Sequence, residues 1–406
     1  MGSEPGIGWN VVREAARRHQ VWAITRRKNE AAICAELQRA PLPNLHMVYV
    51  DLPAPARAWK RGQLGIEAYY RVWQLLTRRV VRRLHRSVRL DLTQHVTFGR
   101  YWSPTSFANL PVPFVWGPVG GGETCPTAFL EDLNPRGRAY EFFREQARRL
   151  GEWDPSVRMA ARRAALALAV TPETRSRLLA LGTKRVELLS AMGLDRTTFE
   201  HLSRLPAANA SGIRFVSMGR LLHWKGFHLG LKAFAAAALP QSEYWIVGDG
   251  PERAALTDLV RRLGVESRVH FLRSVARSQA LEKLAAFHVL IHPSLHDSGG
   301  WVCLEAMAAG KPVICLDLGG PAEQITADTG VKVAARDPKQ AVCDLAQAMT
   351  RLGCDAELRH DMGEAGRERV RREYLWEKKG DRLAALYASV LDDPGIPTPR
   401  TRSMGQ

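Results

Sequence analysis

The segment from His292 to Pro312 constrains the fold more than any other part of this sequence. It reads His-Pro-Ser-Leu-His-Asp-Ser-Gly-Gly-Trp-Val-Cys-Leu-Glu-Ala-Met-Ala-Ala-Gly-Lys-Pro. The pattern predicts an apolar strand that ends at His292, a loop with two glycines, a helix that stops at Gly310, and a second apolar strand. Parallel sheets built from such units bind ligands at the carboxyl ends of their strands, with anions at helix amino ends.

The same alternation of strand and helix covers the C-terminal half from Gly212 onward. Each predicted strand is a short apolar run, and a loop and a helical segment follow most of them. Alternation of this length predicts a parallel sheet with helices on both faces. The strands are expected at 213–217, 244–247, 269–272, 287–292 and 313–316.

The N-terminal half is less regular but has the same kinds of segment. We therefore predict two doubly wound α/β domains, at 1–191 and 192–374, with a linker near 192–211. An amphipathic helix at 375–392 and a disordered tail at 393–406 follow them. In the N-terminal half, strands are expected at 21–25, 47–50, 93–96, 114–116 and 166–170, and helices at 9–18 and 69–86.

The composition sets further limits. A chain of 406 residues is long enough for two cores, and it has no run of 18 apolar residues that would predict a spanning helix. Its start has neither the apolar run of a signal peptide nor a myristoylation pattern. Its six cysteines form no C-x-x-C pair, which favours a reducing compartment without structural zinc. We therefore expect a cytoplasmic protein.

Several motifs stand out along the chain. They are Gly219-Arg220-Leu221…Lys225-Gly226, Val247-Gly248-Asp249-Gly250-Pro251-Glu252, Pro293-Ser294…Asp297, Leu304-Glu305-Ala306-Met307-Ala308-Ala309-Gly310-Lys311-Pro312-Val313 and, less diagnostic, Gly2-Ser3-Glu4-Pro5-Gly6-Ile7-Gly8-Trp9 and Trp116-Gly117-Pro118-Val119-Gly120-Gly121-Gly122-Glu123. These motifs resemble those of the family 4 retaining glycosyltransferases, which have the GT-B architecture of two facing Rossmann-like domains. The resemblance implies transfer of a sugar from a nucleotide-sugar donor, retention at the anomeric carbon, no metal or other cofactor, and a C-terminal helix that crosses back to the N-terminal domain.

Two cations and two carboxylates are the candidate catalytic residues. In the family, the residues that match Arg220 and Lys225 grip the diphosphate, whose growing negative charge needs fixed positive groups when no metal is present. The alternative is a pair of solvated surface cations. No Asp-x-Asp metal motif occurs, and Pro293 argues against a helical metal pair at His292 and His296.

The carboxylates follow the family pattern of Glu, seven residues and Glu. Glu305 matches the second glutamate, which accepts hydrogen bonds from the ribose hydroxyls, and its alternative reading is a first-turn helix carboxylate stabilised by the dipole. Asp297 stands where the family usually has its first glutamate, which faces the donor sugar. Because Asp is shorter by one methylene, the sugar must sit closer or a water must bridge.

Backbone groups complete the predicted donor site. Gly299, Gly300 and Trp301 lie between the carboxylates, where a Cβ would keep the sugar and phosphate away. Glycine pairs such as Gly248 and Gly250 also mark plain turns. The family places base recognition after the strand at 269–272. The predicted donor-binding residues are Gly219, Gly248, Gly250, Arg273, Ser274, Gly299, Gly300, Trp301 and Glu305.

The N-terminal domain offers weaker candidates on the acceptor side. His95 ends a predicted strand and either faces the donor sugar, as in many family members, or is a structural histidine. Gly120, Gly121, Gly122 and Glu123 either line the acceptor side or form a tight turn. No general base is assigned, because the favoured account of retention is attack on the same face, assisted by the leaving phosphate.

One departure from the family concerns the N-terminal sheet. Family members have a central strand before the Gly-Ser-Glu loop, whereas this sequence begins at that loop. A sheet without a middle strand leaves unpaired backbone and a groove in its core. Two alternatives stay open: the true start lies upstream, or the N-terminal domain is impaired.

The net charge of +17 permits an anionic partner. Arginines alternate with aromatic and aliphatic residues in the predicted helix at 69–86, a pattern that suits an anionic membrane surface. The alternative is a solvated face over an ordinary core stripe, and no nucleic-acid-binding module is found. We predict peripheral binding on the inner face of the plasma membrane. The arginines concerned are Arg71, Arg78, Arg79, Arg82, Arg83, Arg86 and Arg89, then Arg144, Arg148, Arg149, Arg158, Arg162 and Arg163.

The resulting functional hypothesis is a metal-independent, retaining hexosyltransferase that uses a nucleotide-sugar donor and a glycan or lipid-linked acceptor. The alternative is an inactive sugar-nucleotide-binding scaffold or regulator, which the missing strand favours and which Arg220, Lys225 and Glu305 oppose. A dinucleotide-dependent oxidoreductase is not expected, because no predicted strand leads into Gly-x-Gly-x-x-Gly with an acidic residue further on.

Overall fold

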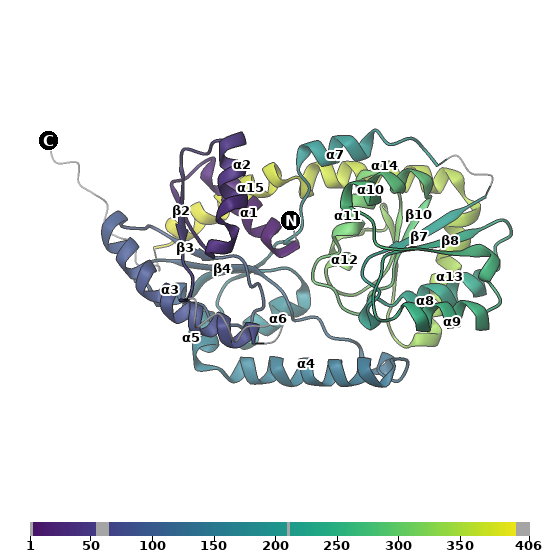
Figure 1. Ribbon diagram of the computed structural model, residues 1–406, viewed down its shortest axis with the longest axis horizontal. Coiled ribbons are helices and arrows are strands. Elements are labelled where there is room, and N and C mark those ends of the chain that lie inside the picture. Colours follow the sequence, from purple (N-terminus) through teal and green to yellow (C-terminus); the bar gives the residue numbers. More distant parts are fainter. Residues whose placement is uncertain (1–2, 54–64, 209–211, 395–406) are drawn as a thin grey trace.

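The computed structural model describes residues 3–53, 65–208 and 212–394 and shows two α/β lobes side by side along the long axis (Figure 1). The N-terminal lobe holds the strands up to Leu188, and the C-terminal lobe holds the strands from Arg214 onward. The strand pairs of both lobes are parallel. This arrangement confirms the predicted α/β class with two domains of parallel sheet. Residues 395–406 of the predicted tail lie outside the described residues.

The sheet of the C-terminal lobe has the strand order β12-β11-β10-β7-β8-β9. Every residue of β10 and β11 is buried, because helices cover both faces of a parallel sheet. Their sequences, Val-Leu-Ile-His and Val-Ile-Cys-Leu, are mostly apolar for the same reason. The strands are β7 (Arg214–Met218), β8 (Glu243–Val247), β9 (Val269–Leu272), β10 (Val289–His292), β11 (Val313–Leu316) and β12 (Gly330–Val333).

The helices of this lobe start where the local sequence provides a cap. Asp337 accepts hydrogen bonds from the amides of Lys339 and Gln340, and Pro338 occupies the first turn of α13. α13 then packs along α8. The helices are α8 (Phe227–Ala237), α9 (Arg253–Arg262), α10 (Arg277–Lys283), α11 (Trp301–Ala308), α12 (Gly319–Gln324), α13 (Pro338–Cys354) and α14 (Ala356–Arg369).

The N-terminal lobe differs because its strands form two sheets, β1-β2 and β3-β4-β5-β6. Among the described residues no strand lies between β1 and β3. β4 is buried along its whole length, whereas all five residues of β1 are only half-buried. The split agrees with the prediction of a missing middle strand. The strands are β1 (Val21–Thr25), β2 (Leu45–Tyr49), β3 (Thr93–His95), β4 (Phe114–Val119), β5 (Ala164–Ala169) and β6 (Val186–Leu188).

One expectation about an N-terminal segment is wrong. The Gly-Ser-Glu segment is not a loop over its described residues, because α1 begins at Ser3; Pro5 is tolerated near the start of a helix, where amides lack a helical partner. The predicted linker at 192–211 includes a short helix, α7 (Arg196–Ser203). The remaining helices are α1 (Ser3–Ala16), α2 (Glu30–Arg39), α3 (Ile66–Val88), α4 (Pro135–Trp153), α5 (Pro155–Arg163) and α6 (Pro172–Ala180).

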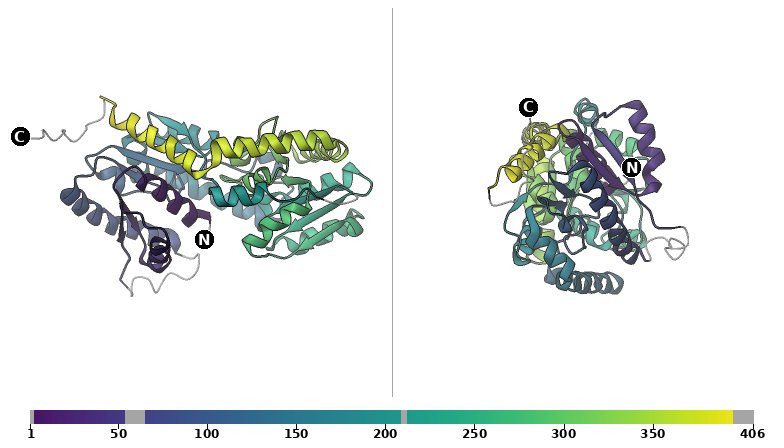
Figure 2. Two further views of the ribbon diagram at one scale, coloured as in Figure 1. Left: turned by 90° about the horizontal axis from the view of Figure 1, so that it is seen from above. Right: turned by 90° about the vertical axis from the view of Figure 1, so that its left-hand side faces the viewer.

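The last helix, α15 (Trp376–Leu391), joins the two lobes, as the sequence predicts. It follows α14 and a π-helical turn at 370–374, and the yellow end of the ribbon runs back over the N-terminal lobe in Figure 2. It packs on α1, and Asp381 pairs with Arg18. The Tyr387 hydroxyl donates a hydrogen bond to Gln94 of the strand β3. Within the described residues, no helix is both long and apolar enough to cross a membrane.

Candidate active site

The loops after β7 and β10 are neighbours, because these two strands pair side by side, with Val289 opposite Phe215 and Leu290 opposite Val216. From β7 the chain builds β8 and β9 on one side, and it later returns to build β10, β11 and β12 on the other. The strand order therefore reverses between β7 and β10. In open α/β sheets, the carboxyl ends of the strands at this reversal are the preferred place for a ligand.

A lysine, an aspartate and a histidine meet at this point. Lys225 donates from Nζ to Oδ2 of Asp297 at 2.5 Å, and Nε2 of His292 lies 3.2 Å from the same oxygen. The other carboxylate oxygen accepts from the amide of Gly299 at 3.1 Å. The side chains of Lys225 and Asp297 are 21% and 17% exposed, so the ion pair is mostly shielded from water.

The charges of this cluster are set by burial and by its own members. Burial raises the pKa of Asp297, but the Lys225 ammonium and His292 lower it more strongly, and the net pKa lies well below the ordinary value. Burial lowers the pKa of His292, which favours a neutral imidazole. Asp297 is the only partner of the ammonium among the described residues, so Lys225 keeps donors for an anionic ligand.

The second predicted carboxylate, Glu305, lies on α11, which begins directly after the Asp297 loop. Its Oε1 accepts two hydrogen bonds from Arg277, from Nη2 at 2.6 Å and from Nε at 3.1 Å. Burial raises the pKa of Glu305, and the Arg277 guanidinium opposes that rise. Glu305 is the fifth residue of α11, beyond its first turn, so the alternative reading as a first-turn carboxylate is wrong.

The start of α11 brings its backbone close to the site, while its tryptophan turns away. Gly300 is the N-cap residue and has a φ of 69°, a left-handed conformation that favours glycine. The indole of Trp301 donates to the carbonyl of Gly193 at 3.0 Å, and the Arg277 guanidinium lies 4.9 Å from its ring centroid. The Trp301 side chain thus packs against the segment that joins the lobes.

The loops after β7 and β8 touch through backbone atoms. A Cβ at Gly248 would lie 1.9 Å from the carbonyl oxygen of Gly219, and one at Gly250 would lie 2.5 Å from that of Leu221. The amide of Leu221 also donates to the carbonyl of Asp249 at 3.0 Å. These glycines hold two loops together, so in the structure they have a packing role beside the predicted donor role.

Three predicted residues are exposed at the same edge of the sheet. Arg220 follows β7, and Arg273 and Ser274 follow β9. Within the described part of the chain, no hydrogen bond or ion pair of the Arg220 side chain is formed. Arg220 and Lys225 belong to the same loop, but the Arg220 side chain does not contact the ion pair of Lys225 and Asp297.

The glycine-rich loop of the N-terminal lobe meets the Asp297 loop across the two lobes. Ser298 donates to Oε2 of Glu123 at 2.6 Å, and the amide of Gly121 donates to the same oxygen at 2.9 Å. The other oxygen accepts from Thr171 and Thr174 at 2.7 and 3.1 Å. Glu123 is 3% exposed.

The three neighbouring glycines are also tightly packed. A Cβ at Gly120 would lie 2.7 Å from Val170, one at Gly121 would lie 2.4 Å from Trp102, and one at Gly122 would lie 2.5 Å from Thr174. In this structure the segment from Gly120 to Glu123 forms no turn; it is tightly packed, and Glu123 links it to the C-terminal lobe through Ser298. Its assignment to the acceptor side stays a prediction.

His95 is enclosed by the N-terminal lobe. It is 5% exposed, and its Nδ1 lies 3.0 Å from Oγ1 of Thr105. Burial lowers the pKa of His95 to about 4. No hydrogen bond connects His95 to Lys225, Asp297 or Glu305, so the structure agrees with the alternative of a structural histidine.

Sequence reasoning missed a second contact between the lobes. Glu141 of α4 accepts hydrogen bonds on one oxygen from His223 and His296, both at 2.9 Å. Burial raises the pKa of Glu141, but the two histidines lower it, to about 2. Trp224 stacks between Tyr140 and His296. His296 belongs to a recognised motif, but no pattern in the sequence links it to Glu141, 155 residues earlier.

The chain resembles glycosyltransferases in both sequence and structure. Residues 202–369 match the family model described as Glycosyl transferases group 1. The lipopolysaccharide core biosynthesis glycosyltransferase LpsE of Rhizobium meliloti is 30% identical over 228 residues, which are 54% of this chain and 63% of that protein. Glycogen synthase of Mycobacterium tuberculosis is 28% identical over 211 residues, 51% of this chain and 50% of that protein. The chain thus spans less than two thirds of each relative.

Solved structures match over nearly the whole chain. The sucrose-phosphate synthase of Thermosynechococcus elongatus aligns with a TM-score of 0.64 and 18% identity over 96% of this chain and 94% of that one. Anabaena HepE in complex with UDP and glucose aligns with a TM-score of 0.60 and 18% identity over 96% and 98%. At this identity the likeness concerns the fold, which is the two-lobed GT-B arrangement.

Proposed function

We propose that this chain is a retaining, metal-independent glycosyltransferase of family 4 that transfers a sugar from a nucleotide-sugar donor to a glycan or lipid-linked acceptor. The observation that carries the proposal is the ion pair between Lys225 and Asp297 at the carboxyl ends of β7 and β10. It lies within the segment that matches the group 1 glycosyltransferases. Relatives that act in lipopolysaccharide core biosynthesis and a similar fold solved with UDP and glucose support the substrate class.

In this proposal the cations stabilise the leaving group. Cleavage of the bond between sugar and phosphate leaves a nucleoside diphosphate with extra negative charge, and preorganised donors lower the barrier most when they face that charge. Lys225 retains free N–H donors beside Asp297. Arg220 is exposed on the same loop, and its planar guanidinium can bind two phosphate oxygens at once.

The carboxylates have separate roles. The Oε2 atom of Glu305 remains as an acceptor for the ribose hydroxyls, while Arg277 holds Oε1. Asp297 already accepts from Lys225, His292 and Gly299, so we propose that it mainly fixes the Lys225 ammonium. The acceptor attacks on the face that the diphosphate leaves, and a diphosphate oxygen takes its proton.

Donor hydrolysis and transfer assays on the full-length protein test this function. UDP-, GDP- and ADP-sugars are supplied in the presence of EDTA, with or without a lipid-linked glycan acceptor. Release of a nucleoside diphosphate, with an α-linked product from an α-linked donor, is expected. Turnover that requires added Mg²⁺ or Mn²⁺, or a product with inverted configuration, contradicts the corresponding part of the proposal.

The inactive scaffold is the alternative, and the split N-terminal sheet is the observation that favours it. Both functions predict affinity for a nucleoside diphosphate, but only the transferase consumes the donor. Calorimetric binding of UDP, GDP or ADP without hydrolysis or transfer from any donor of the panel would therefore decide for the scaffold. Absence of both binding and turnover would exclude both functions.

We also propose that the N-terminal lobe binds an anionic membrane surface through α4. This helix runs along the lower side of the molecule in Figure 1. Its large apolar side chains are between 59% and 74% exposed, and their spacing places them on one face. Exposed arginines flank that face, as in helices that lie in a membrane interface. The apolar residues are Phe142, Phe143, Leu150 and Trp153, and the arginines are Arg136, Arg138 and Arg149.

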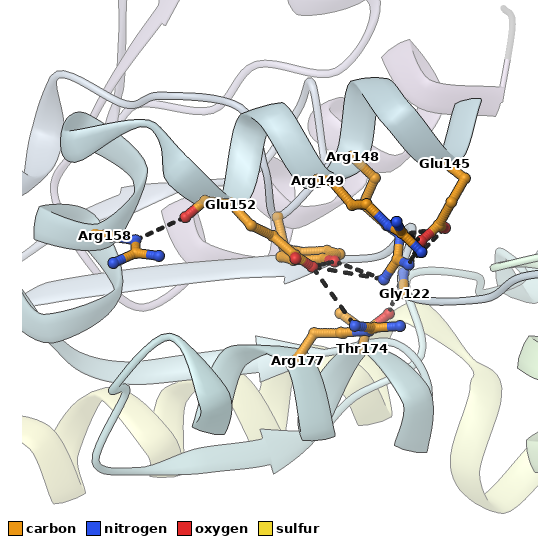
Figure 3. Close-up of polar contacts among 9 residues, drawn as sticks. Gly122, Glu145, Arg148, Arg149, Glu152, Arg158, Thr174 and Arg177 are labelled. Carbon is orange, nitrogen blue, oxygen red and sulfur yellow. Dashed lines mark hydrogen bonds and ion pairs between the residues drawn. The ribbon is translucent and has the colours of Figure 1, made fainter. Parts of the chain in front are cut away.

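Two of the arginines predicted for this surface are instead structural. Arg148 is only 2% exposed and binds Glu145 at 2.5 Å and the Tyr101 hydroxyl at 3.3 Å. Figure 3 shows Arg148 turned inward between α4 and α6. Arg158 donates to the carbonyl of Glu152 at 2.8 Å. The membrane contact was predicted for α3, but α3 buries Tyr69, Tyr70 and Val81, as its alternative of an ordinary core stripe holds, and its Arg71 pairs with Asp154 at 2.5 Å.

Flotation with lipid vesicles tests the membrane contact. The protein is expected to float with phosphatidylglycerol vesicles at low salt and not with phosphatidylcholine vesicles. The substitutions Phe143→Ser and Trp153→Ser together should abolish flotation. Leu179→Ser is the matched control, because Leu179 is 46% exposed on α6. Equal binding to both lipids, or unchanged flotation of the double variant, contradicts the proposal.

A further inference from the structure

The loops that carry Lys225 and Asp297 contact each other just before these two residues. They follow the paired strands β7 and β10. The carbonyl of Trp224 accepts a hydrogen bond from the amide of Leu295 at 2.8 Å and another from the hydroxyl of Ser294 at 3.1 Å. A displacement of either loop therefore displaces the other and changes the position of the ion pair.

A carboxylate of the N-terminal lobe binds both loops. Glu141 of α4 accepts on Oε1 from Nε2 of His223 and from Nε2 of His296, both at 2.9 Å. His223 lies two residues before Lys225, and His296 lies directly before Asp297. The three side chains of this contact are at most 11% exposed, so water competes little for its hydrogen bonds. Figure 1 shows α4 reaching from the N-terminal lobe toward the C-terminal lobe.

Aromatic rings of both lobes pack beside this carboxylate. The Trp224 ring stacks on the Tyr140 ring of α4, with 4.9 Å between the centroids, and on the His296 ring at 5.5 Å. The Tyr140 ring also meets the His223 ring edge to face at 5.1 Å. The residue directly before Lys225 is thus held by α4 on one side and by the loop after β10 on the other.

This support matters because Lys225 is a point charge on a flexible stem. A donor that faces charge developing in the transition state is effective only when it is already in place, and a displacement of about 1 Å can lower the rate by about 100-fold. Asp297 orients the ammonium at 2.5 Å but itself belongs to a loop. Within the described residues, Glu141 forms no hydrogen bond or ion pair with Lys225 or Asp297, so it can act on them only through its partners.

We propose that Glu141 is a positioning residue of the donor site, which holds the loops of Lys225 and Asp297 in place through His223 and His296. In this way α4 of the N-terminal lobe sets the geometry of a site that lies in the C-terminal lobe. The inference rests on the proposed transferase function, because it concerns the rate of donor cleavage.

Steady-state kinetics of donor consumption tests the role of Glu141. Glu141→Ala is expected to lower kcat by about 10- to 100-fold and to change the KM of the donor by less than about threefold, because the contacts that bind the ground state remain. Glu141→Gln keeps an oxygen that accepts from both imidazoles, so its kcat should stay within about threefold of the parent protein. Equal losses in the two variants, or a higher KM with unchanged kcat, contradict the proposal.

A second contact between the lobes provides the matched control. Asp132 accepts from Nζ of Lys232 at 2.8 Å, and Lys232 lies on α8 and not on a loop of the ion pair. Asp132→Ala removes this contact, and its kcat should stay within about threefold of the parent protein. If its kcat falls as far as that of Glu141→Ala, both residues only hold the lobes together, and the proposal is overturned.

A double variant shows whether Glu141 acts through the lysine. In a protein that already carries Lys225→Ala, the further change Glu141→Ala should lower kcat by less than about threefold, because the group that it positions is absent. A general loss of structure would instead lower kcat by the same factor with and without Lys225. That result would contradict the proposal.

Amide exchange gives a readout that needs no turnover. The amides of Lys225 and Leu295 donate within the two loops at 3.0 and 2.8 Å, and Glu141→Ala should speed their exchange at least about tenfold, whereas Asp132→Ala should not. His223→Phe removes one of the two imidazole donors and is the second variant if Glu141→Ala does not fold. Unchanged exchange in these variants contradicts the proposal. If the parent protein consumes no donor, the transferase function fails, and faster exchange in Glu141→Ala still supports the hold of Glu141 on the loops.

Discussion

In the C-terminal lobe six strands lie edge to edge, whereas in the N-terminal lobe a cavity of about 880 Å³ separates β1 and β2 from the other four. The central strands β10 and β11 are buried at every residue, while β1 is half-buried throughout. Both lobes follow the same plan of parallel strands between helices. The difference shows that the continuity of the sheet decides how deeply a strand is buried, even where helices cover both faces.

The same contrast separates the sites of the two lobes. In the C-terminal lobe, β7 and β10 pair directly, and this pairing brings Lys225 and Asp297 to 2.5 Å. In the N-terminal lobe, β1 and β3 belong to separate sheets, and the cavity lies between them. The N-terminal residues that meet the site, such as Glu123 and Glu141, come instead from the segment after β4 and from α4. The continuous sheet of the C-terminal lobe thus positions the proposed catalytic residues. The N-terminal lobe contacts them through residues that follow β4.

Matched truncations in the two sheets should show this difference most strongly. Ile291→Ala in β10 removes a fully buried side chain and is expected to lower the free energy of unfolding by about 2–5 kcal/mol. Ile24→Ala in β1 removes a half-buried side chain beside an existing cavity and should cost about 1 kcal/mol or less. Urea denaturation of both variants measures the costs. Equal decreases in the free energy of unfolding for the two variants would show that the cavity beside β1 is closed in solution.

Removal of the lysine in the complete sheet should have the next largest effect. Lys225→Ala deletes the ammonium held by Asp297 and is expected to lower kcat by about 100- to 1,000-fold, because a preorganised donor of the leaving diphosphate is lost. Lys332→Ala is the matched control, since Lys332 pairs with Asp317 at 3.5 Å on the edge strand β12. Steady-state kinetics of donor consumption compares them. Similar turnover by both variants would remove Lys225 from the mechanism.

The sequence predicts the parts of this molecule that depend on local patterns. The apolar runs of β7 and β10 indicate a parallel sheet, and a shared carboxyl edge explains why Lys225 and Asp297 lie together. The roles of these residues in donor binding stay predictions.

The parts that the sequence does not predict depend on contacts between distant segments. Arg277 is one of many arginines, and nothing in the sequence shows that its side chain reaches Glu305, 28 residues later. The contact of Glu141 with His223 and His296 requires the relative placement of the two lobes. The start of α1 is missed for a local reason, because its glycines and Pro5 are typical of loops.

One histidine in each lobe, His95 and His288, should give a smaller, pH-dependent effect. Burial lowers the pKa of His95 and of His288 from 6.5 to about 4. Below pH 6.5 the histidine of the unfolded chain binds a proton, whereas that of the folded chain stays neutral until about pH 4. The free energy of unfolding therefore decreases as the pH is lowered from 6.5 to 4. For fully buried His95 the loss reaches about 3 kcal/mol, since one pKa unit corresponds to about 1.4 kcal/mol.

Variants of the two histidines separate these contributions. His95→Gln should flatten the fall in stability between pH 7 and pH 4.5 more than His288→Gln, because His288 is only half-buried. Urea midpoints across this range measure the effect. A steeper fall in the His95 variant than in the parent protein would mean that the buried ring is protonated.

The smallest change in stability is expected at Arg277, and it tests whether Glu305 serves the ligand or the fold. The Arg277 side chain is 54% exposed, so its ion pair with Glu305 contributes little, and Arg277→Ala should change the free energy of unfolding by about 0.5 kcal/mol or less.

Without the guanidinium, burial alone acts on Glu305, and its pKa rises further. A protonated Glu305 accepts poorly from the ribose hydroxyls, so affinity for the nucleoside diphosphate should begin to fall at a higher pH than in the parent protein. Arg261→Ala, which breaks the exposed pair with Asp258, is the control. Calorimetric titrations between pH 5 and pH 8 measure this affinity. If it depends on pH in the same way for both variants, Glu305 does not bind the ribose, and its pairing with Arg277 only contributes to the fold of the C-terminal lobe.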